Sequence, residues 1–141
     1  MTEKTQQLCR IQLPAELKSL PLFMERVIES AARSGMGEHK LGAMELALEE
    51  AIVNIVKYSS HKPDSIITVE CALKNGTEFT IDIIDDGPEF NPLDRDTPDV
   101  DADITHRPIG GLGIFFIKEM TDGVSYARKD KKNILTIVMK K

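Results

Sequence analysis

The sequence of 141 residues predicts an α+β fold, a two-layer sandwich in which helices cover one face of a mixed, mainly antiparallel sheet. Two observations support this class. Short segments with alternating apolar and polar residues, typical of strands, recur in hairpin-like pairs. Longer segments with apolar residues three and four apart, typical of helices, separate the first strand from the others. The expected order is β-α-α-β-β-α-β-β, in one compact domain over residues 1–141.

The chain begins with a strand and an amphipathic helix. Residues 8–13 alternate between apolar and polar side chains, which predicts an edge strand, and Pro14 ends it because proline cannot donate to a strand ladder. In residues 15–34 the apolar side chains recur at intervals of three and four, so we expect a helix with one buried face. Gly35 and Gly37 break this helix.

The second helix, residues 38–58, is apolar around most of its circumference, which is typical of a core helix packed on more than one side. Glu50 and Asn54 lie one turn apart on one face, and Lys57 and Tyr58 continue that face. Burying an unpaired amide or carboxylate costs roughly 2 kcal/mol or more. This polar stripe therefore faces water, a ligand or a metal, or it forms a satisfied network inside an ordinary helix.

The second half of the chain is expected to hold two hairpins, a short helix and one long loop. Asn75-Gly76 marks the first hairpin, because these residues adopt the positive φ of a tight turn. The segments are strands at 67–73, 79–83, 124–128 and 134–139, a turn at 129–133 and a helix at 114–120. Residues 91–108 are irregular, and a loop this long in a small domain indicates a lid or a binding segment.

Composition excludes several classes of function. The formal charge of −5 argues against a protein that binds nucleic acid by neutralising its phosphates. Apolar runs fall short of the ~20 residues that span a membrane, and the polar N-terminus lacks a hydrophobic signal region, so we expect a cytoplasmic protein. Cys9 and Cys71 fall in expected strands and are too few for a disulfide framework or a metal site, which favours core packing.

Two glycine-containing segments are suited to contact a nucleotide. Gly110, Gly111 and Gly113 precede the short helix, where backbone N–H groups can hold a phosphate, although glycines also simply start helices. Asp85 ends a strand just before Gly87. Its carboxylate can accept from the exocyclic amine of adenine while the glycine leaves room for the ring; alternatively, the aspartate only bonds amides of its own turn.

The polar stripe of the second helix suits phosphate chemistry. Asn54 offers a neutral oxygen ligand for Mg²⁺, which binds few protein groups together with substrate phosphates. Glu50, one turn earlier, is placed to take a proton from a hydroxyl or water that attacks the γ-phosphate of ATP. Lys57 could neutralise phosphate charge, or it could be an ordinary surface lysine.

The segments EEAIVN, DDG and GGLG, in this order and spacing, resemble the N, G1 and G2 boxes of the Bergerat-fold ATPases, the group that includes gyrase, Hsp90, histidine kinases and MutL. Within this group, the short length, IDDGPEFNP and GGLGIFFIKEMTD look like the bacterial anti-sigma factor serine/threonine kinases. The resemblance covers roughly residues 10–139, and its three motifs are more specific together than singly.

The resemblance implies roles for individual residues. Glu50 is the general base, Asn54 the Mg²⁺ ligand and Asp85 the adenine contact, with Gly87 beside the base. Gly111 and Gly113 are implied to contact phosphates. Thr136 is implied to support the adenine-binding aspartate, although an ordinary strand position suits it nearly as well.

The resemblance also implies an ATP lid at about residues 88–112, and here the sequence departs from the family pattern. Glu89 stands where a second glycine often lies. Where relatives carry a lid arginine that reaches the γ-phosphate, this chain has Ile109, and Arg107 is the candidate substitute.

The implied function is an ATP- and Mg²⁺-dependent protein serine kinase that phosphorylates a small anti-anti-sigma partner of the STAS type and sequesters a sigma factor. A homodimer is also implied, for which the apolar face of the first helix offers an interface. The alternative is a nucleotide-sensing switch that binds a protein without phosphate transfer. A histidine-kinase fragment is disfavoured because no long histidine-bearing helix precedes the domain, and a purely structural domain would bind no nucleotide.

Overall fold

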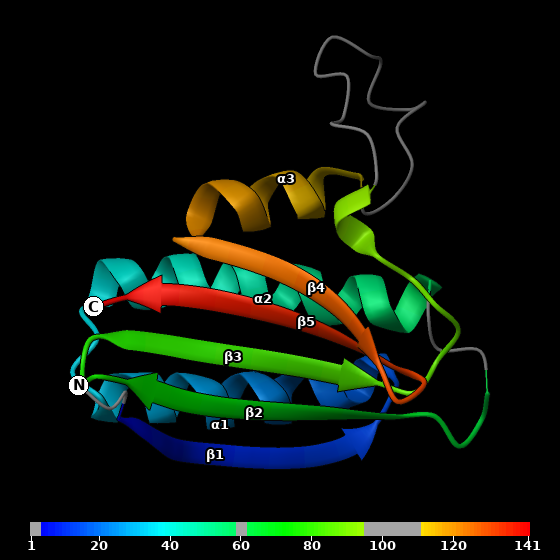
Figure 1. Ribbon diagram of the computed structural model, residues 1–141, viewed down its shortest axis with the longest axis horizontal. Helices are drawn as coiled ribbons and strands as arrows, with labels where there is room; N and C mark the ends of the chain where they lie inside the picture. The colour runs from blue at the N-terminus through cyan, green and yellow to red at the C-terminus, as the bar shows by residue number, and fades with distance from the viewer. Residues whose placement is uncertain (1–3, 59–61, 95–110) are drawn as a thin grey trace, which may run out of the picture.

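The computed structural model describes residues 4–58, 62–94 and 111–141 (Figure 1). The elements follow the expected order, with two short 3-10 helices added: β1 (Thr5–Pro14), η1 (Leu17–Ser19), α1 (Leu20–Arg33), α2 (Glu38–Tyr58), β2 (Ile66–Lys74), β3 (Glu78–Asp85), η2 (Pro92–Asp94), α3 (Gly111–Met120), β4 (Gly123–Lys129) and β5 (Lys132–Lys140). None of the described helices is both long and apolar enough to cross a membrane.

The predicted α+β class is confirmed. The five strands form one sheet in the order β1-β2-β3-β5-β4, and every neighbouring pair is antiparallel. The expected edge position of β1 is also confirmed. Helices α1 and α2 lie behind the sheet, and α3 packs against α2 next to β4 (Figure 1).

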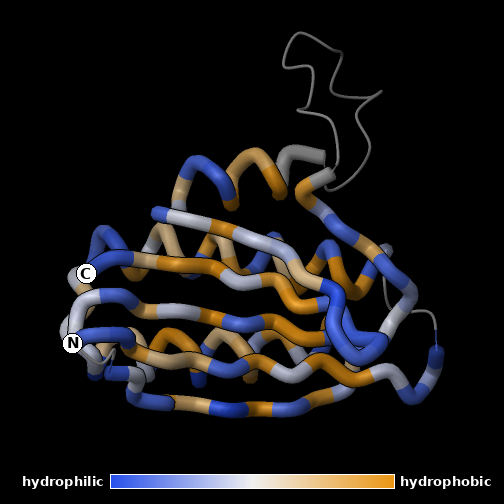
Figure 2. Tube along the Cα trace, viewed as in Figure 1, coloured by the Kyte–Doolittle hydropathy of each residue, from blue (hydrophilic) through white to orange (hydrophobic). Residues whose placement is uncertain are grey.

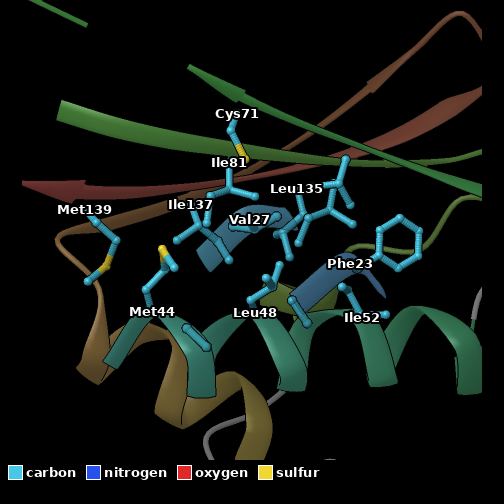
Figure 3. Packing of buried hydrophobic residues seen from close by; sticks show 14 of the residues in the cluster. Phe23, Val27, Met44, Leu48, Ile52, Cys71, Ile81, Leu135, Ile137 and Met139 are labelled. Carbon is cyan, nitrogen blue, oxygen red and sulfur yellow. The ribbon is translucent and has the colours of Figure 1, made fainter. Parts of the chain in front are cut away.

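A single hydrophobic core fills the space between the helices and the sheet. Apolar side chains of α1 and α2 meet those of the central strands (Figure 3), among them Phe23, Val27, Met44, Leu48, Ile52, Ile81, Leu135 and Ile137. Helix α2 contributes buried residues from Met44 to Ile55, which explains why this part of its sequence is apolar on more than one side.

Both predicted hairpins are present, and the second is tighter than expected. Asn75 and Gly76 have φ values of 54° and 71°, as a two-residue turn requires. In the second hairpin only Asp130 and Lys131 form the turn, with φ values of 52° and 64°, because β4 and β5 remain paired up to Lys129 and Lys132. This turn is the hydrophilic segment that joins β4 to β5 in Figure 2.

The two cysteines face each other across neighbouring strands, and both are buried and free, as expected for core packing. Burial raises the pKa of the Cys71 thiol, and the adjacent Cys9 raises it further. The thiol therefore stays protonated at neutral pH, which suits a packing role better than a reactive one.

A carboxylate links the start of α2 to the last strand. Asp122 Oδ2 accepts a hydrogen bond from the backbone N–H of Lys140 at 2.7 Å and another from Lys40 Nζ at 3.0 Å. These bonds, the backbone one foremost, hold the pKa of Asp122 below its ordinary value of 3.8. Because the folded-state pKa is lowered, the stabilisation is present above about pH 4 and is lost as the pH falls through the folded-state value.

We therefore expect Asp122→Asn to lower the free energy of unfolding at pH 7 by no more than about 1 kcal/mol, because solvent screens this partly exposed group. The variant should also lose less stability than the wild type between pH 5 and 3, a range of about two units around the ordinary pKa. Urea unfolding at several pH values measures both effects. Glu45→Gln, exposed on α2, is the control, and equal acid sensitivity in Asp122→Asn and wild type would contradict the assignment.

Candidate functional site

Segments far apart in the sequence meet at one end of the sheet. The C-terminal ends of α2 and β3, the start of β5 and the start of α3 all lie at the same end of the molecule (Figure 1). Helices α2 and α3 also pack against each other. Residues 50–58, 85–87 and 111–113, which carry the three motifs of the sequence, are thereby brought to one side of the fold.

Asn54 is a buried polar residue of α2. Its side chain is 2% exposed, and among the described residues neither Oδ1 nor Nδ2 has a hydrogen-bond partner. Its helical neighbours Ala51 and Ile55 are apolar and buried. An unpaired buried amide costs roughly 1–3 kcal/mol, so this side chain fits a site where a bound group supplies the missing interactions.

Glu50 lies one turn before Asn54 and is half-buried, whereas Lys57 is exposed in the last turn of the helix. The same end of α2 is joined to the loop after β3 by Tyr58, whose ring stacks on that of Phe90 with centroids 5.9 Å apart and planes at 24°. The carboxyl group of Glu50 is therefore partly accessible to solvent, while the end of α2 packs against the loop after β3.

Asp85 is the last residue of β3 and is 3% exposed. Its Oδ1 accepts from the backbone N–H of Gly87 at 2.9 Å, so the local turn considered from the sequence does form. The same oxygen also accepts from Nδ2 of Asn133 on β5, at 3.0 Å. The aspartate is thus bonded both to its own turn and across the sheet.

Asn133 is a site residue that the sequence analysis missed. Both ends of its amide are used: Oδ1 accepts from Phe90 N (3.1 Å), Tyr126 Oη (2.6 Å) and Arg128 Nη1 (3.1 Å), and Nδ2 donates to Asp85 Oδ1 (3.0 Å) and Pro88 O (2.8 Å). A signal was available, because strand alternation places residue 133 on the same face as Leu135 and Ile137, both buried. A polar residue at a core-facing position needs such partners.

The expectation that Thr136 supports Asp85 was wrong. The Thr136 hydroxyl donates instead to Asp82 Oδ1, at 2.6 Å, because residues 82 and 136 are paired between β3 and β5. Successive side chains of a strand point to opposite faces, so Thr136 lies on the other face of the sheet from Asp85. The strand partner of Asp85 is Asn133.

The glycine motif falls at the start of α3. The helix begins at Gly111, three residues earlier than predicted, so Gly111 and Gly113 belong to its first turn, where backbone N–H groups have no partner within the helix. Arg107 and Gly110 lie outside the described residues, as does most of the expected lid.

The described part of the chain contains no group of three His, Cys, Asp or Glu side chains that could hold a metal unaided. A divalent cation at Asn54 would therefore need oxygen ligands from a bound molecule, which is the usual mode of Mg²⁺ with nucleotides.

The larger of two cavities in the described part of the chain does not coincide with the candidate site. A cavity of about 760 Å³ lies elsewhere, between β1 and α1, and is lined by residues such as Cys9, Arg26 and Arg33 but by none of the predicted site residues. Near the end of β3 a cavity of about 90 Å³ is lined by Asp85, Asp86 and Lys132, among others. The chemistry of Asn54 and Asp85 therefore identifies the candidate site better than volume does.

Comparison with known families agrees with the geometry. The profile of the histidine kinase-like ATPase domain matches residues 13–139, nearly the whole chain. The serine-protein kinase RsbW of Listeria monocytogenes serovar 1/2a is 30% identical over 119 residues, which cover 81% of this chain and 75% of the relative. RsbW of Bacillus cereus is 24% identical over 129 residues, covering 89% of this chain and 80% of the relative.

Solved structures support the same fold. The structure of the RsbU and RsbW domains of Rv1364c from Mycobacterium tuberculosis matches 93% of this chain with a TM-score of 0.63 and 14% identity, and this chain covers 31% of that longer protein. The mycobacterial sensor histidine kinase MprB matches 94% of this chain and 97% of its own, with a TM-score of 0.55 and 18% identity. At these identities the likeness establishes the fold alone.

Proposed function

Because the chain belongs to the histidine kinase-like ATPase domain family and is related to the RsbW serine-protein kinases, we propose that it uses ATP to phosphorylate a serine of a small anti-anti-sigma partner. In a separate complex it sequesters a sigma factor. The partner of the phosphate-transfer reaction is a STAS-type domain.

One observation carries the assignment of the site. Asn54 is a buried amide with no partner among the described residues, and it lies one turn from Glu50. It belongs to the C-terminal part of α2, and the end of that helix lies at the same end of the fold as the end of β3 and the start of α3 (Figure 1). A stabilising role does not account for Asn54, because an apolar residue there would cost less. A ligand that brings oxygen atoms and a cation would satisfy it.

Each side chain then has a distinct task. Asn54 Oδ1 would serve as a ligand of Mg²⁺, Asp85 would accept from the 6-amino group of adenine, and Gly87 would leave space for the ring. Backbone N–H groups at Gly111 and Gly113 contact phosphate oxygens, and the exposed ammonium of Lys57 offsets their charge. When bound with the triphosphate, Mg²⁺ neutralises charge on the phosphate oxygens.

Glu50 takes the proton in the transfer step. The serine Oγ of the partner attacks the γ-phosphorus, the bond from that phosphorus to the β,γ-bridging oxygen breaks to release ADP, and the seryl proton passes to the Glu50 carboxylate. Positioning and charge stabilisation supply most of the acceleration in such reactions. The half-buried location of Glu50 lets it meet a hydroxyl that arrives from the partner's surface.

We also propose that residues 1–141 act as a single domain, with an ATP lid at about residues 88–112 in which Arg107 approaches the γ-phosphate. The stack of Tyr58 on Phe90 supports a fixed start for this lid, because it attaches the first lid residues to α2.

The proposed activity is tested by incubating the full chain with γ-labelled ATP, Mg²⁺ and its cognate STAS-domain partner. We expect label on one serine of the partner and none when that serine is changed to alanine. Saturable nucleotide binding with no label on the partner would contradict the kinase and leave a nucleotide-sensing switch. Absence of both binding and transfer would contradict the nucleotide site altogether.

A further inference from the structure

We propose that Asn133, held in one orientation by Tyr126 and Arg128, is a positioning residue that presents Asp85 as a hydrogen-bond acceptor and thereby makes the site selective for adenine. This inference rests on the proposed function, since it concerns how the same nucleotide site distinguishes purines. Asn133 is not in the three motifs, and its contacts come from the strand order, which places β5 beside β3.

The orientation of the Asn133 amide is dictated by two backbone groups. The N–H of Phe90 can only donate, and it faces Oδ1 at 3.1 Å; the carbonyl of Pro88 can only accept, and it faces Nδ2 at 2.8 Å. Rotating the amide by 180° would set donor against donor and acceptor against acceptor. The NH₂ group is therefore the one that faces Asp85.

Two side chains of β4 reinforce this orientation. Tyr126 donates its hydroxyl to Asn133 Oδ1 at 2.6 Å, and burial, with the charge of Glu89 adding to it, raises the pKa of this phenol, so the donor persists at neutral pH. Arg128 donates from Nη1 to Asn133 Oδ1 and also to the carbonyl of Gly87, at 3.1 and 2.8 Å. Side chains of the β4–β5 hairpin thus hold the loop after β3 by hydrogen bonds to backbone groups of that loop.

The fixed orientation of the Asn133 amide determines which group faces Asp85. Its Oδ1 receives two N–H donors, from Gly87 and from Asn133, and neither can accept a hydrogen bond in that direction. The two bonds hold the carboxylate in one place, so that it can present an acceptor oxygen to a nucleobase that lies beside Gly87. At position 6 adenine carries an amino donor, which the carboxylate can accept, whereas guanine and hypoxanthine carry a carbonyl oxygen there, which the carboxylate repels.

The test compares the affinities of the full chain for ADP and for inosine diphosphate, in which a carbonyl replaces the 6-amino group. Asn133→Asp places an acceptor opposite Asp85 in place of the donor. We expect its ADP affinity to fall about tenfold and its affinity for inosine diphosphate to change little, so that the selectivity ratio falls about tenfold. Thr136→Val is the matched control, because it removes a bond between the same two strands on the opposite face, and both of its affinities should stay within about twofold of wild type.

A second variant keeps the inference testable if Asn133→Asp folds poorly. Arg128 is exposed, so Arg128→Ala should still fold, with a melting temperature only a few degrees below wild type, while its ADP affinity falls about threefold. Lys129→Ala is the control, because that side chain points to the opposite face of β4, and its ADP affinity should equal that of the wild type. A ratio of ADP affinity to inosine diphosphate affinity that is lower in Asn133→Asp than in wild type supports the proposal. An unchanged ratio in a folded Asn133→Asp, or wild-type ADP affinity in Arg128→Ala, would overturn it.

Failure of the proposed function gives a different result. Wild-type protein that binds neither diphosphate would contradict the nucleotide site itself, and the present inference with it. Wild-type protein that prefers ADP, beside an Asn133→Asp variant with the same preference, would overturn the role of Asn133 only.

Discussion

Glu50→Gln is expected to reduce phosphate transfer to the partner about 10²- to 10⁴-fold, the usual contribution of a general base. Glutamine keeps the shape of glutamate but cannot accept the seryl proton. Because Glu50 is assigned no contact with the nucleotide, the ATP affinity should stay within about threefold of wild type. Single-turnover transfer of labelled phosphate, together with equilibrium titration of ATP, separates the two effects.

Glu49→Gln is the matched control, since it makes the same chemical change on the adjacent, exposed residue of α2. It should transfer phosphate at the wild-type rate. Wild-type transfer by Glu50→Gln would contradict the base role, and a parallel loss in both variants would point to net charge on the helix instead.

Asn54→Leu should make the protein more stable and at the same time remove Mg²⁺-dependent nucleotide binding. Leucine branches at Cγ as asparagine does and carries no polar atoms, so it removes the cost of burying an amide that has no partner among the described residues. We expect a gain of about 1 kcal/mol or more in the free energy of unfolding, equivalent to about 3 °C in melting temperature. The Mg²⁺-dependent part of the ATP affinity should be lost because the ligand oxygen is gone.

Thermal unfolding without ligand and with Mg²⁺ATP measures both parts of this prediction. Thr80→Val is the comparison, because Thr80 is also buried but its hydroxyl donates to the carbonyl of Ala72. That variant should gain no stability and should keep its shift with Mg²⁺ATP. An Asn54→Leu variant that is less stable than wild type, or that is stabilised by Mg²⁺ATP as strongly as wild type, would contradict the assignment.

Most of the fold could be predicted from the sequence because its elements carry strong local signals. The periodicity of residues 38–58 identified α2 with its observed bounds, and Asn75-Gly76 specified the first hairpin. The insertion of β5 between β3 and β4 could not be read in this way, since strand order depends on packing between segments more than forty residues apart in sequence. The start of α3 at Gly111 was also missed, because glycine has a poor intrinsic propensity for helices.

The site residues also differ in whether a local sequence signal points to them. Glu50, Asn54 and Asp85 could be proposed as site residues from the sequence because each sits in a short motif or breaks a local pattern. Asn133 could not, because its role depends on the strand partner it acquires in the fold. Thr136 was misassigned for the same reason: residues three apart on a strand point to opposite faces, and only the register shows which of them meets Asp85.

The central claim is that three separate segments bind one adenine nucleotide with its divalent cation, and that Asn54 contacts the cation. The most direct measurement is calorimetric titration of ATP into the full chain with Mg²⁺ and with EDTA. The account predicts saturable one-to-one binding that weakens about tenfold or more when Mg²⁺ is removed. No heat of binding under either condition, or equal affinity with and without the cation, would contradict it.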